Sequence, residues 1–231
     1  MIKAAVFGAN GRMGKLVIQE AEKKLNIIQT FDLGANLEID NSVNVIIDFS
    51  LPSAWVNLDS LLSRTDAALV SGTTGLGDDN ILMLKSWAEK RPVFYSSNMS
   101  VGIYALGKLM QSATSMLGDS FDKELIEFHH RHKKDSPSGT AETLLKNWAG
   151  KQIYGRKGNV GEREPASIGV HAVRGGDIIG EHHLYFLGDG ERLTLSHQAT
   201  DRKVFALGAI RAAKFIITKA PGLYSMGDML G

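Results

Sequence analysis

The chain of 231 residues contains no cysteine. This absence excludes disulfide bonds, thiolate zinc sites, iron–sulfur ligation and a cysteine nucleophile, and it is typical of a reducing compartment. The sequence also has no run that approaches the ~20 apolar residues needed to span a bilayer. Its first apolar run leads directly into a glycine loop and is too short for a signal peptide. We therefore expect a cytoplasmic protein without a membrane partner.

A strong net charge is missing as well. The formal charge is +1 at pH 7, so nothing global favours nucleic acid or an anionic membrane as a partner. Hydrophobic residues make up 43% and charged residues 22%, as in an ordinary globular protein of one large or two small domains. All seven histidines lie between His129 and His197, so any imidazole chemistry belongs to the middle of the chain.

The first hundred residues alternate short apolar runs with helical periodicity, which predicts a parallel sheet with crossover helices. We expect strands at 4–7, 27–31, 43–49, 67–71 and 92–95. Beyond residue 100 we expect a helix at 103–117, a strand at 125–128, a helix from about 141 to Trp148, and strands at 168–173, 178–187 and 192–198. The turn Gly188-Asp189-Gly190 predicts a hairpin, so this region is expected to form a largely antiparallel sheet.

A glycine loop follows the first expected strand and opens the first helix. Its glycines are Gly8, Gly11 and Gly14, spaced to let the backbone approach a pyrophosphate at a helix N-terminus. Glycines also serve ordinary turns. Asp32 follows the second strand, where a carboxylate accepts hydrogen bonds from an adenosine ribose, although it also suits a turn. Leu33 stands where an arginine would pair with the 2′-phosphate of NADPH, so we expect NADH to be preferred, with NADPH possible.

These features predict an α/β fold: a Rossmann-like dinucleotide-binding domain with an inserted α+β domain built on a mixed, largely antiparallel sheet. A helical pattern at 203–219 would return the chain to the first domain. We expect residues 1–99 and 203–231 to bind the dinucleotide. Residues 100–202 would form the inserted, substrate-binding domain.

Further loops at the carboxyl ends of expected strands suit contacts to a nicotinamide and its ribose, or are simply good turn formers. They are Gly72-Thr73-Thr74-Gly75, Ser96-Ser97-Asn98-Met99, and Phe49-Ser50 after Asp48.

The segment from His129 to Thr140 concentrates the chemistry. Three histidines, one arginine and two lysines occupy positions 129–134. A solvated basic loop, a metal site and a nucleic-acid patch are alternatives, but the adjacent His129 and His130 point in different directions and the net charge is near zero. We expect no metal and no nucleic acid. Ser138, Gly139 and Thr140 precede an amphipathic helix, where free N–H groups would hold a carboxylate, or where Ser138 or Thr140 would only cap the helix.

The runs 129–133 and 135–141 resemble the characteristic motif of the dihydrodipicolinate reductases, also named 4-hydroxy-tetrahydrodipicolinate reductases. The resemblance covers the whole chain in order, through runs 8–14, 72–75, 98–102, 174–182 and 222–226. Two departures touch the cofactor: the stretch between Asp32 and Val43 is short, and Leu33 replaces a frequent arginine. Ser136 replaces a frequent alanine, which we expect to be harmless.

The resemblance implies that His129 is the catalytic acid/base, Lys133 the proton donor, and His130, Gly139 and Thr140 substrate-binding residues, with Ser138 in the same turn. It also implies a set of cofactor-binding residues, to which the strand-end pair Phe49 and Ser50 is added. These are Gly8, Ala9, Asn10, Gly11, Arg12, Met13, Asp32, Phe49, Ser50, Gly72, Thr73, Thr74, Ser96, Ser97, Asn98, Met99 and Arg202.

The implied activity is the NAD(P)H-dependent reduction of 4-hydroxy-tetrahydrodipicolinate, a small dicarboxylate, to tetrahydrodipicolinate on the diaminopimelate route to lysine. The family also suggests a homotetramer, with residues 100–202 carrying the contacts between subunits through their sheet. Two alternatives stay open: another Rossmann oxidoreductase of the aspartate or homoserine dehydrogenase type, and a non-catalytic NAD-binding sensor.

Overall fold

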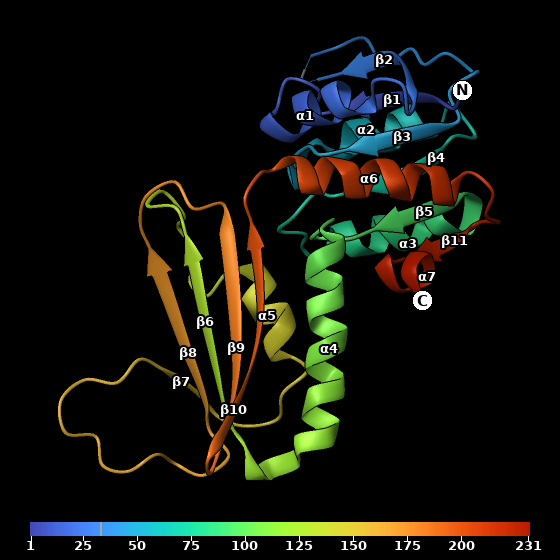
Figure 1. Ribbon diagram of the computed structural model, residues 1–231. Coiled ribbons are helices and arrows are strands. Elements are labelled where there is room, and N and C mark those ends of the chain that lie inside the picture. The colour runs from blue at the N-terminus through green and yellow to red at the C-terminus, as the bar shows by residue number, and fades with distance from the viewer. Residues whose placement is uncertain (33) are drawn as a thin grey trace. The chain divides into compact units, whose positions relative to one another are not determined.

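A computed structural model describes residues 1–32 and 34–231 and divides them into two compact units (Figure 1). Unit 1 comprises residues 1–101 and 202–231, and unit 2 comprises residues 102–201. The expected division, with boundaries after residues 99 and 202, lies beside these positions. The functional role given to each part stays a prediction.

Unit 1 is a parallel sheet with helices on both faces. Its strands pair in the order β11-β5-β4-β3-β1-β2, and all neighbours are parallel. The strands are β1 (Lys3–Phe7), β2 (Asn26–Phe31), β3 (Val45–Asp48), β4 (Ala68–Ser71), β5 (Pro92–Tyr95) and β11 (Gly222–Tyr224). The helices are α1 (Arg12–Ala21), α2 (Trp55–Leu62) with a preceding 3₁₀ turn η1 (Pro52–Ala54), α3 (Asp78–Lys90), α6 (Lys203–Ile216) and α7 (Met226–Leu230).

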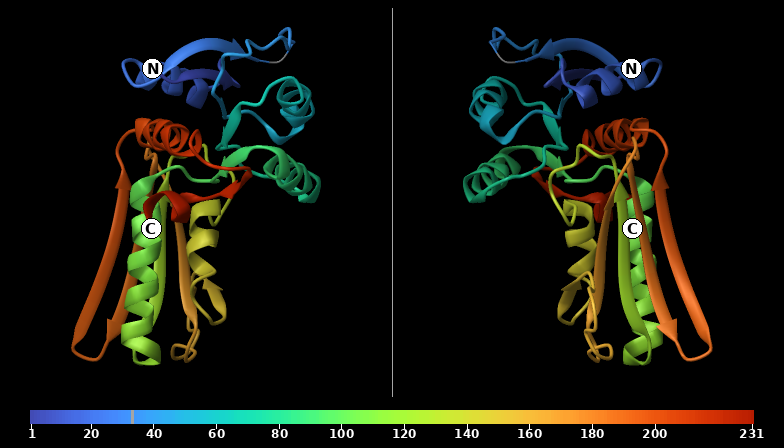
Figure 2. Two further views of the ribbon diagram at one scale, coloured as in Figure 1. Left: turned by 90° about the vertical axis from the view of Figure 1, so that its right-hand side faces the viewer. Right: turned by 90° about the vertical axis from the view of Figure 1, so that its left-hand side faces the viewer.

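The central strands of unit 1 are continuous apolar runs because both of their faces are covered. Every residue of β3 and β4 is buried. On one face, Ile46 and Leu69 pack with Trp55 and Trp87 from α2 and α3. The helices α1 and α6 pack together on the opposite face (Figures 1 and 2). The helices cover the faces of the sheet and not the ends of its strands. Open α/β sheets bind ligands at the carboxyl ends.

Unit 2 is a mixed sheet with helices over one face. Its strands pair in the order β10-β9-β6-β8-β7. They are β6 (Asp122–His129), β7 (Gln152–Tyr154), β8 (Ile168–Arg174), β9 (Gly180–Gly188) and β10 (Glu191–Ala199). The helices are α4 (Val101–Leu117), followed by a 3₁₀ turn η2 (Gly118–Ser120), and α5 (Gly139–Leu145).

The core of unit 2 follows from two periodicities. In α4, Leu106, Met110 and Ala113 recur at helical spacing and are buried. In β9, alternate residues are buried, including Leu184 and Phe186. These side chains form one cluster with α5, so α4 and α5 cover the same face of the sheet (Figure 2).

The expected elements are largely confirmed, with differences at their ends. The expected strand 125–128 is longer as β6, the expected helix 203–219 ends at Ile216, and α5 ends at Leu145 although Trp148 is buried beyond it. The short elements α2, β7, β11 and α7 were not expected. The unit 2 sheet is mixed, as expected: β9 pairs antiparallel with β10 and β6, while β8 pairs parallel with β6 and β7. A hairpin turn in the sequence indicates antiparallel pairing but gives no sign of parallel pairing.

Within the described ranges, none of the helices combines the length and the apolar character that a membrane crossing requires.

Candidate active site

The carboxyl edge of the unit 1 sheet brings the expected cofactor loops together. Gly8 follows β1, Asp32 follows β2, Phe49 follows β3, Gly72 follows β4 and Ser96 follows β5. Because these strands are parallel neighbours, their carboxyl ends lie along one edge. From β1 the sheet grows in two directions: β2 lies on one side of β1, and β3, β4 and β5 follow on the other. The change of direction between β1 and β3 is the topological switch point, where open α/β sheets bind ligands.

Two positions of the glycine loop, Gly8 and Gly14, have no room for a side chain. Gly8 has φ of +81°, and a Cβ there would lie 2.9 Å from the carbonyl oxygen of Phe49. A Cβ on Gly14 would lie 2.2 Å from the carbonyl oxygen of Gly8, which no side-chain adjustment relieves. The backbone at the start of α1 therefore lies close to the loop after β1, which only glycine allows. The expected role of this loop in binding a pyrophosphate stays a prediction.

Asp32 lies against the glycine loop. Its Oδ2 accepts a hydrogen bond from the backbone N–H of Asn10 at 2.6 Å. A cavity of about 250 Å³ opens beside it and is lined by Gly8, Gly11, Asp32, Phe49 and Ser50, among others. The cavity sits at the switch point and combines glycine backbone, a carboxylate and apolar wall, which fits part of a dinucleotide. Leu33, on which the expected NADH preference rests, lies outside the described residues.

A larger open depression, of about 1110 Å³, lies at the opposite, amino edge of the same sheet. The guanidinium of Arg91, one of its lining residues, donates to the carbonyl oxygens of Leu62, Thr65 and Ala67. Since that cation already satisfies helix and loop carbonyls, the depression offers no free guanidinium of Arg91 to a phosphate.

Asp48 organises two of the cofactor loops and was not given a role from sequence. It is fully buried, and its Oδ2 accepts hydrogen bonds from Trp55 Nε1 at 3.2 Å, Ser71 Oγ at 2.7 Å and Thr73 Oγ1 at 2.8 Å. Its Oδ1 accepts from the backbone N–H of Ser50 at 2.9 Å. One carboxylate thus fixes the loop after β3 relative to the loop after β4.

Three other residues expected to bind the cofactor, Ser96, Met99 and Arg202, differ in burial and in their place in the fold. Ser96 Oγ donates to the carbonyl oxygen of Asn98 at 2.7 Å, which shapes the loop after β5. Met99 is buried, 1% exposed, so it packs beneath the loop and offers almost no surface to a ligand. Arg202 is the N-cap residue of α6 and belongs to none of the strand-end loops.

In unit 2, the histidine segment begins at the end of β6. His129 is the last residue of that strand and is 7% exposed. The backbone N–H of His130 donates to the carbonyl oxygen of Ile178 at 2.7 Å, and the N–H of Lys133 donates to the carbonyl of His130 at 3.1 Å, which forms a turn. Lys133 Nζ pairs with Asp135 Oδ1 at 2.9 Å. The alternative of a wholly solvated basic loop is therefore wrong for His129 and Lys133.

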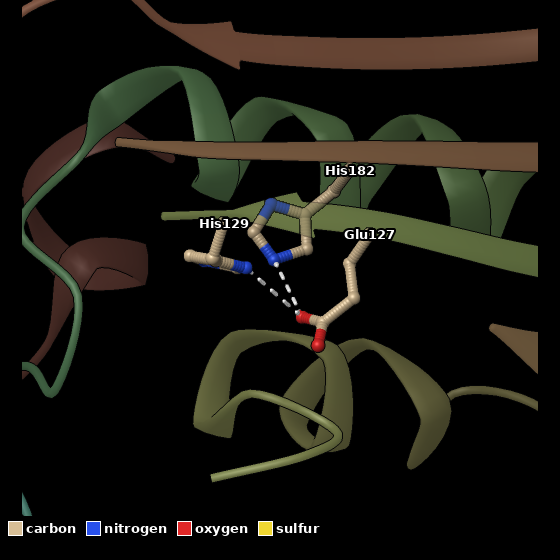
Figure 3. Close-up of side chains that lie close together, drawn as sticks. All are labelled: Glu127, His129 and His182. Carbon is tan, nitrogen blue, oxygen red and sulfur yellow. Dashed lines mark ion pairs between the residues drawn. The ribbon is translucent and has the colours of Figure 1, made fainter. Parts of the chain in front are cut away.

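Three buried side chains converge behind this turn (Figure 3). Glu127 Oε2 lies 3.6 Å from His129 Nδ1 and 3.7 Å from His182 Nε2. Glu127 Oε1 accepts hydrogen bonds from the backbone N–H of Ser138 at 3.0 Å and from Arg174 Nη2 at 2.7 Å. Glu127 and His129 share a face because they lie two residues apart on β6, and His182 comes from the neighbouring strand β9.

Burial sets the charge states of this group. Burial raises the pKa of the Glu127 carboxyl, but the hydrogen bonds from Ser138 and Arg174 outweigh it and hold that pKa below its usual value. Burial, aided by the charges of Lys133 and Arg174 and opposed by Glu127, lowers the pKa of His129 to about 4. Burial also lowers the pKa of His182 to about 3. At neutral pH the group therefore holds an ionised carboxylate facing two neutral imidazoles.

The same three side chains offer ligand atoms within 4.8 Å of one another, as a metal ion would require. However, the guanidinium of Arg174 already pairs with Glu127, and Ser138 Oγ lies 3.2 Å from His182 Nε2. A divalent cation would compete with both and face the positive charge of Arg174. The donor set suits proton chemistry better than metal ligation.

The expected carboxylate-binding turn is also the N-cap of α5. Ser138 is buried, and its Oγ accepts a hydrogen bond from the N–H of Ala141 at 3.1 Å. Of the two interpretations left open for Ser138, the structure supports the helix cap. Gly139 is exposed and Thr140 half-buried, so these two present the turn to solvent.

Glu127, Arg174 and His182 were given no role from sequence, although the last two lie in runs that carry the resemblance. The period-two pattern of β6 places Glu127 and His129 on one face, and that pattern was the available clue. Their meeting with His182 depends on the pairing of β6 with β9, which local sequence does not encode.

The fold and these sites define a class, the Rossmann-type NAD(P)H-dependent oxidoreductases with an inserted α+β domain. Residues 2–99 match the family described as "Dihydrodipicolinate reductase, N-terminus", and residues 102–230 match "Dihydrodipicolinate reductase, C-terminus". The chain belongs to the dihydrodipicolinate reductase family.

Curated relatives agree over their full length. The 4-hydroxy-tetrahydrodipicolinate reductase of Sulfurimonas denitrificans is 41% identical over 254 residues, covering 100% of this chain and 99% of the relative. That of Campylobacter jejuni (strain 81116) is 42% identical over 242 residues and covers 100% of both chains.

Solved structures add the fold alone. A dipicolinate-bound dihydrodipicolinate reductase from Paenisporosarcina sp. TG-14 superposes with a TM-score of 0.76 at 23% identity, covering 100% of both chains. An aspartate dehydrogenase from Thermotoga maritima superposes with a TM-score of 0.50 at 11% identity, covering 95% of this chain and 98% of the other. Because both enzymes share the architecture, the family assignment rests on the sequence matches.

Proposed function

We propose that this chain reduces 4-hydroxy-tetrahydrodipicolinate to tetrahydrodipicolinate, with a reduced nicotinamide dinucleotide, on the diaminopimelate route to lysine. Full-length relatives about 40% identical carry this activity in their names. The observation that carries the proposal in the structure is the buried pair of Glu127 and His129 beside the Lys133 turn. It supplies proton chemistry in the segment that the resemblance makes catalytic.

The reaction needs one hydride and one proton. The hydroxyl substrate first loses water and becomes a conjugated imine, and a bound reduced nicotinamide supplies the hydride. A new C–H bond then forms, and the electrons displaced through the conjugated system must be neutralised by a proton. The protein therefore has to hold a proton near the acceptor and stabilise negative charge while it develops.

Lys133 is our proposed proton donor. Its Nζ is held by Asp135 at 2.9 Å, and its side chain is 20% exposed, which keeps it oriented and still accessible. His129 is neutral at pH 7, because burial lowers its pKa to about 4, so it accepts or relays a proton but does not store one. We infer that His129 exchanges a proton with the reacting system while Lys133 delivers the proton that neutralises the product.

We propose that a substrate carboxylate binds where Gly139 and Thr140 begin α5, with His130 beside it. Ser138 shapes that turn through its cap to Ala141 and its contact with His182. The Paenisporosarcina reductase binds dipicolinate, a dicarboxylate of related shape, which supports this class of ligand.

We propose that the cofactor residues act through the glycine loop, Asp32 and the loops after β3, β4 and β5, with NADH preferred. The preference rests on Asp32 as a ribose partner and on the absence of arginine at position 33. Comparing kcat/KM for NADH and NADPH tests it, and equal or better values with NADPH would remove it.

The cytoplasmic homotetramer also stays a proposal. Exposed apolar side chains in unit 2 support contacts between copies, among them Tyr154 and Val173 on β7 and β8. Sedimentation equilibrium of the purified chain measures the assembly directly.

The decisive experiment supplies enzymatically generated hydroxy-tetrahydrodipicolinate and follows the loss of reduced-nicotinamide absorbance. We expect turnover that depends on both substrates. Turnover with aspartate or homoserine-type substrates instead, or cofactor binding with no turnover, would favour one of the two alternatives.

A further inference from the structure

Glu127 is a fully buried carboxylate that the resemblance leaves without a role. It is 0% exposed and lies on β6, two residues before His129. Taking an ionised carboxylate out of water costs several kcal/mol unless partners compensate it. The arrangement of those partners shows what the side chain does.

The two oxygens of Glu127 have different surroundings. Oε1 accepts two hydrogen bonds, from the backbone of Ser138 and from Arg174 Nη2. Among the described residues, Oε2 makes no hydrogen bond, and it faces His129 Nδ1 at 3.6 Å and His182 Nε2 at 3.7 Å (Figure 3). His129 Nδ1 is likewise buried without a hydrogen-bond partner there. A carboxylate that served only to pair with Arg174 would use both oxygens on it.

The distance of 3.6 Å between Glu127 Oε2 and His129 Nδ1 is slightly longer than a hydrogen bond. The carboxylate oxygen is an acceptor, and the ring nitrogen can carry the proton that it would accept. Catalytic hydrogen bonds are often long in the ligand-free protein and shorten during the reaction. A small rotation of either side chain would close this one.

The other ring nitrogen of His129, Nε2, lies beside Gly180 at the start of β9. A Cβ on Gly180 would lie only 3.0 Å from His129 Nε2, so glycine at this position leaves room for the ring. The Glu127 carboxylate therefore faces Nδ1, while Nε2 lies beside a residue that has no side chain.

We propose that Glu127 is a positioning residue that accepts the Nδ1–H of His129, fixes the imidazole in that tautomer and leaves Nε2 to exchange the reaction's proton. The inference rests on the proposed function for its catalytic consequence. When His129 takes up a proton, Glu127 also balances the new charge, as the buried carboxylate does in triads of carboxylate, histidine and nucleophile.

Other charged and titratable groups face the same ring and must be considered with Glu127. They are His182 on β9, Arg174 on β8, and Lys133 and Asp135 in the loop after β6. Lys133 and Arg174 disfavour a protonated His129, whereas Glu127 and Asp135 favour it. Removing the charge of Glu127 should therefore shift the pH dependence of turnover in the direction of a harder-to-protonate His129.

The test compares Glu127→Gln with Glu124→Gln. Glu124 lies on the same strand three residues earlier and pairs instead with Arg156, Arg163 and His171. The amide of Glu127→Gln would donate to His129 Nδ1 and force the other tautomer. We expect kcat to fall about 10- to 100-fold with KM changed less than about threefold, and Glu127→Asp to recover part of the loss. Glu124→Gln should retain kcat.

A direct measurement needs no substrate. Nitrogen-15 NMR of the histidine-labelled protein, assigned with His129→Asn, should show the Nδ1–H tautomer of His129 in the wild type and Nε2–H in Glu127→Gln. An Nε2–H tautomer in the wild type would overturn the proposal, even if Glu127→Gln failed to fold. Wild-type kcat in a folded Glu127→Gln, or an equal loss in Glu124→Gln, would also overturn it. A wild type without turnover would refute the proposed function, while the tautomer would still test the positioning.

Discussion

Asp48 and Thr73 join the ends of two neighbouring strands through a single hydrogen bond, with Thr73 Oγ1 donating to Asp48 Oδ2 at 2.8 Å. The bond links β3 to the loop after β4, and it lies within the part of unit 1 that we expect to hold the dinucleotide. Because Asp48 is buried and accepts donors on both oxygens, the loops depend on its being a carboxylate.

We predict that Asp48→Asn weakens NADH binding at least tenfold and lowers stability by about 1–3 kcal/mol, since an amide NH₂ would face donors in a buried site. Fluorescence titration with NADH and denaturant unfolding measure the two effects. The control is Asp59→Asn, which alters a carboxylate that accepts Trp87 Nε1 at 2.6 Å, away from the loops. It should cost stability alone. Unchanged NADH affinity in Asp48→Asn would remove the role given to Asp48.

Gly14→Ala should cost both stability and dinucleotide affinity. The added methyl group would lie 2.2 Å from the carbonyl oxygen of Gly8, so α1 must move away from β1. Overpacking of this kind costs about 1–3 kcal/mol or more, and the displaced helix start would lose its N–H contacts to the pyrophosphate. The melting temperature and NADH titration report the result. Gly77→Ala, where a methyl group meets nothing within 4 Å, is the matched control and should resemble the wild type.

His129→Ala should lower kcat by about 10²-fold or more while KM changes little, because proton exchange is lost and the carboxylate-binding turn remains. Steady-state kinetics with generated substrate separates the two parameters. Unchanged turnover would remove His129 from the mechanism.

Lys133→Ala should reduce kcat to a similar extent, since the proton donor and the cation paired with Asp135 are both removed. Steady-state kinetics at several pH values measures the loss. Retained activity would instead point to Lys134 or Arg131 as the donor. Lys134→Ala, in the same loop, is the control and should keep wild-type kcat.

Much of the carboxyl edge of the unit 1 sheet could be predicted from sequence because strand-end loops and glycine spacing are local patterns. Gly8, Asp32 and Phe49 fall at consecutive strand ends, and parallel pairing brings them together. The role of Asp48 was hidden, because its partners Ser71 and Thr73 lie more than twenty positions along the chain.

The buried cluster around Glu127 was predictable only in part. His129 and Lys133 stand in one short run, which sequence exposes directly. His182 reaches Glu127 across the pairing of β9 with β6, and Arg174 reaches it from β8, which pairs parallel with β6. Parallel pairing leaves no hairpin to recognise, so local sequence gave no sign that Arg174 meets Glu127.

His182 should make the folded protein sensitive to acid. Burial, first of all, lowers its pKa from 6.5 to about 3, so the unfolded chain takes up a proton on His182 that the folded chain refuses. Stability is therefore retained above pH 6.5 and lost as the pH falls from 6.5 toward 3, by up to about 1.4 kcal/mol per pH unit from this one group.

Denaturant unfolding at a series of pH values should show a flatter decline in His182→Gln than in the wild type. His183→Gln, on the other face of β9 and bonded to Ser196, is the control for losing a histidine from that strand. Equal slopes in His182→Gln and the wild type would mean that the folded protein accommodates a protonated His182.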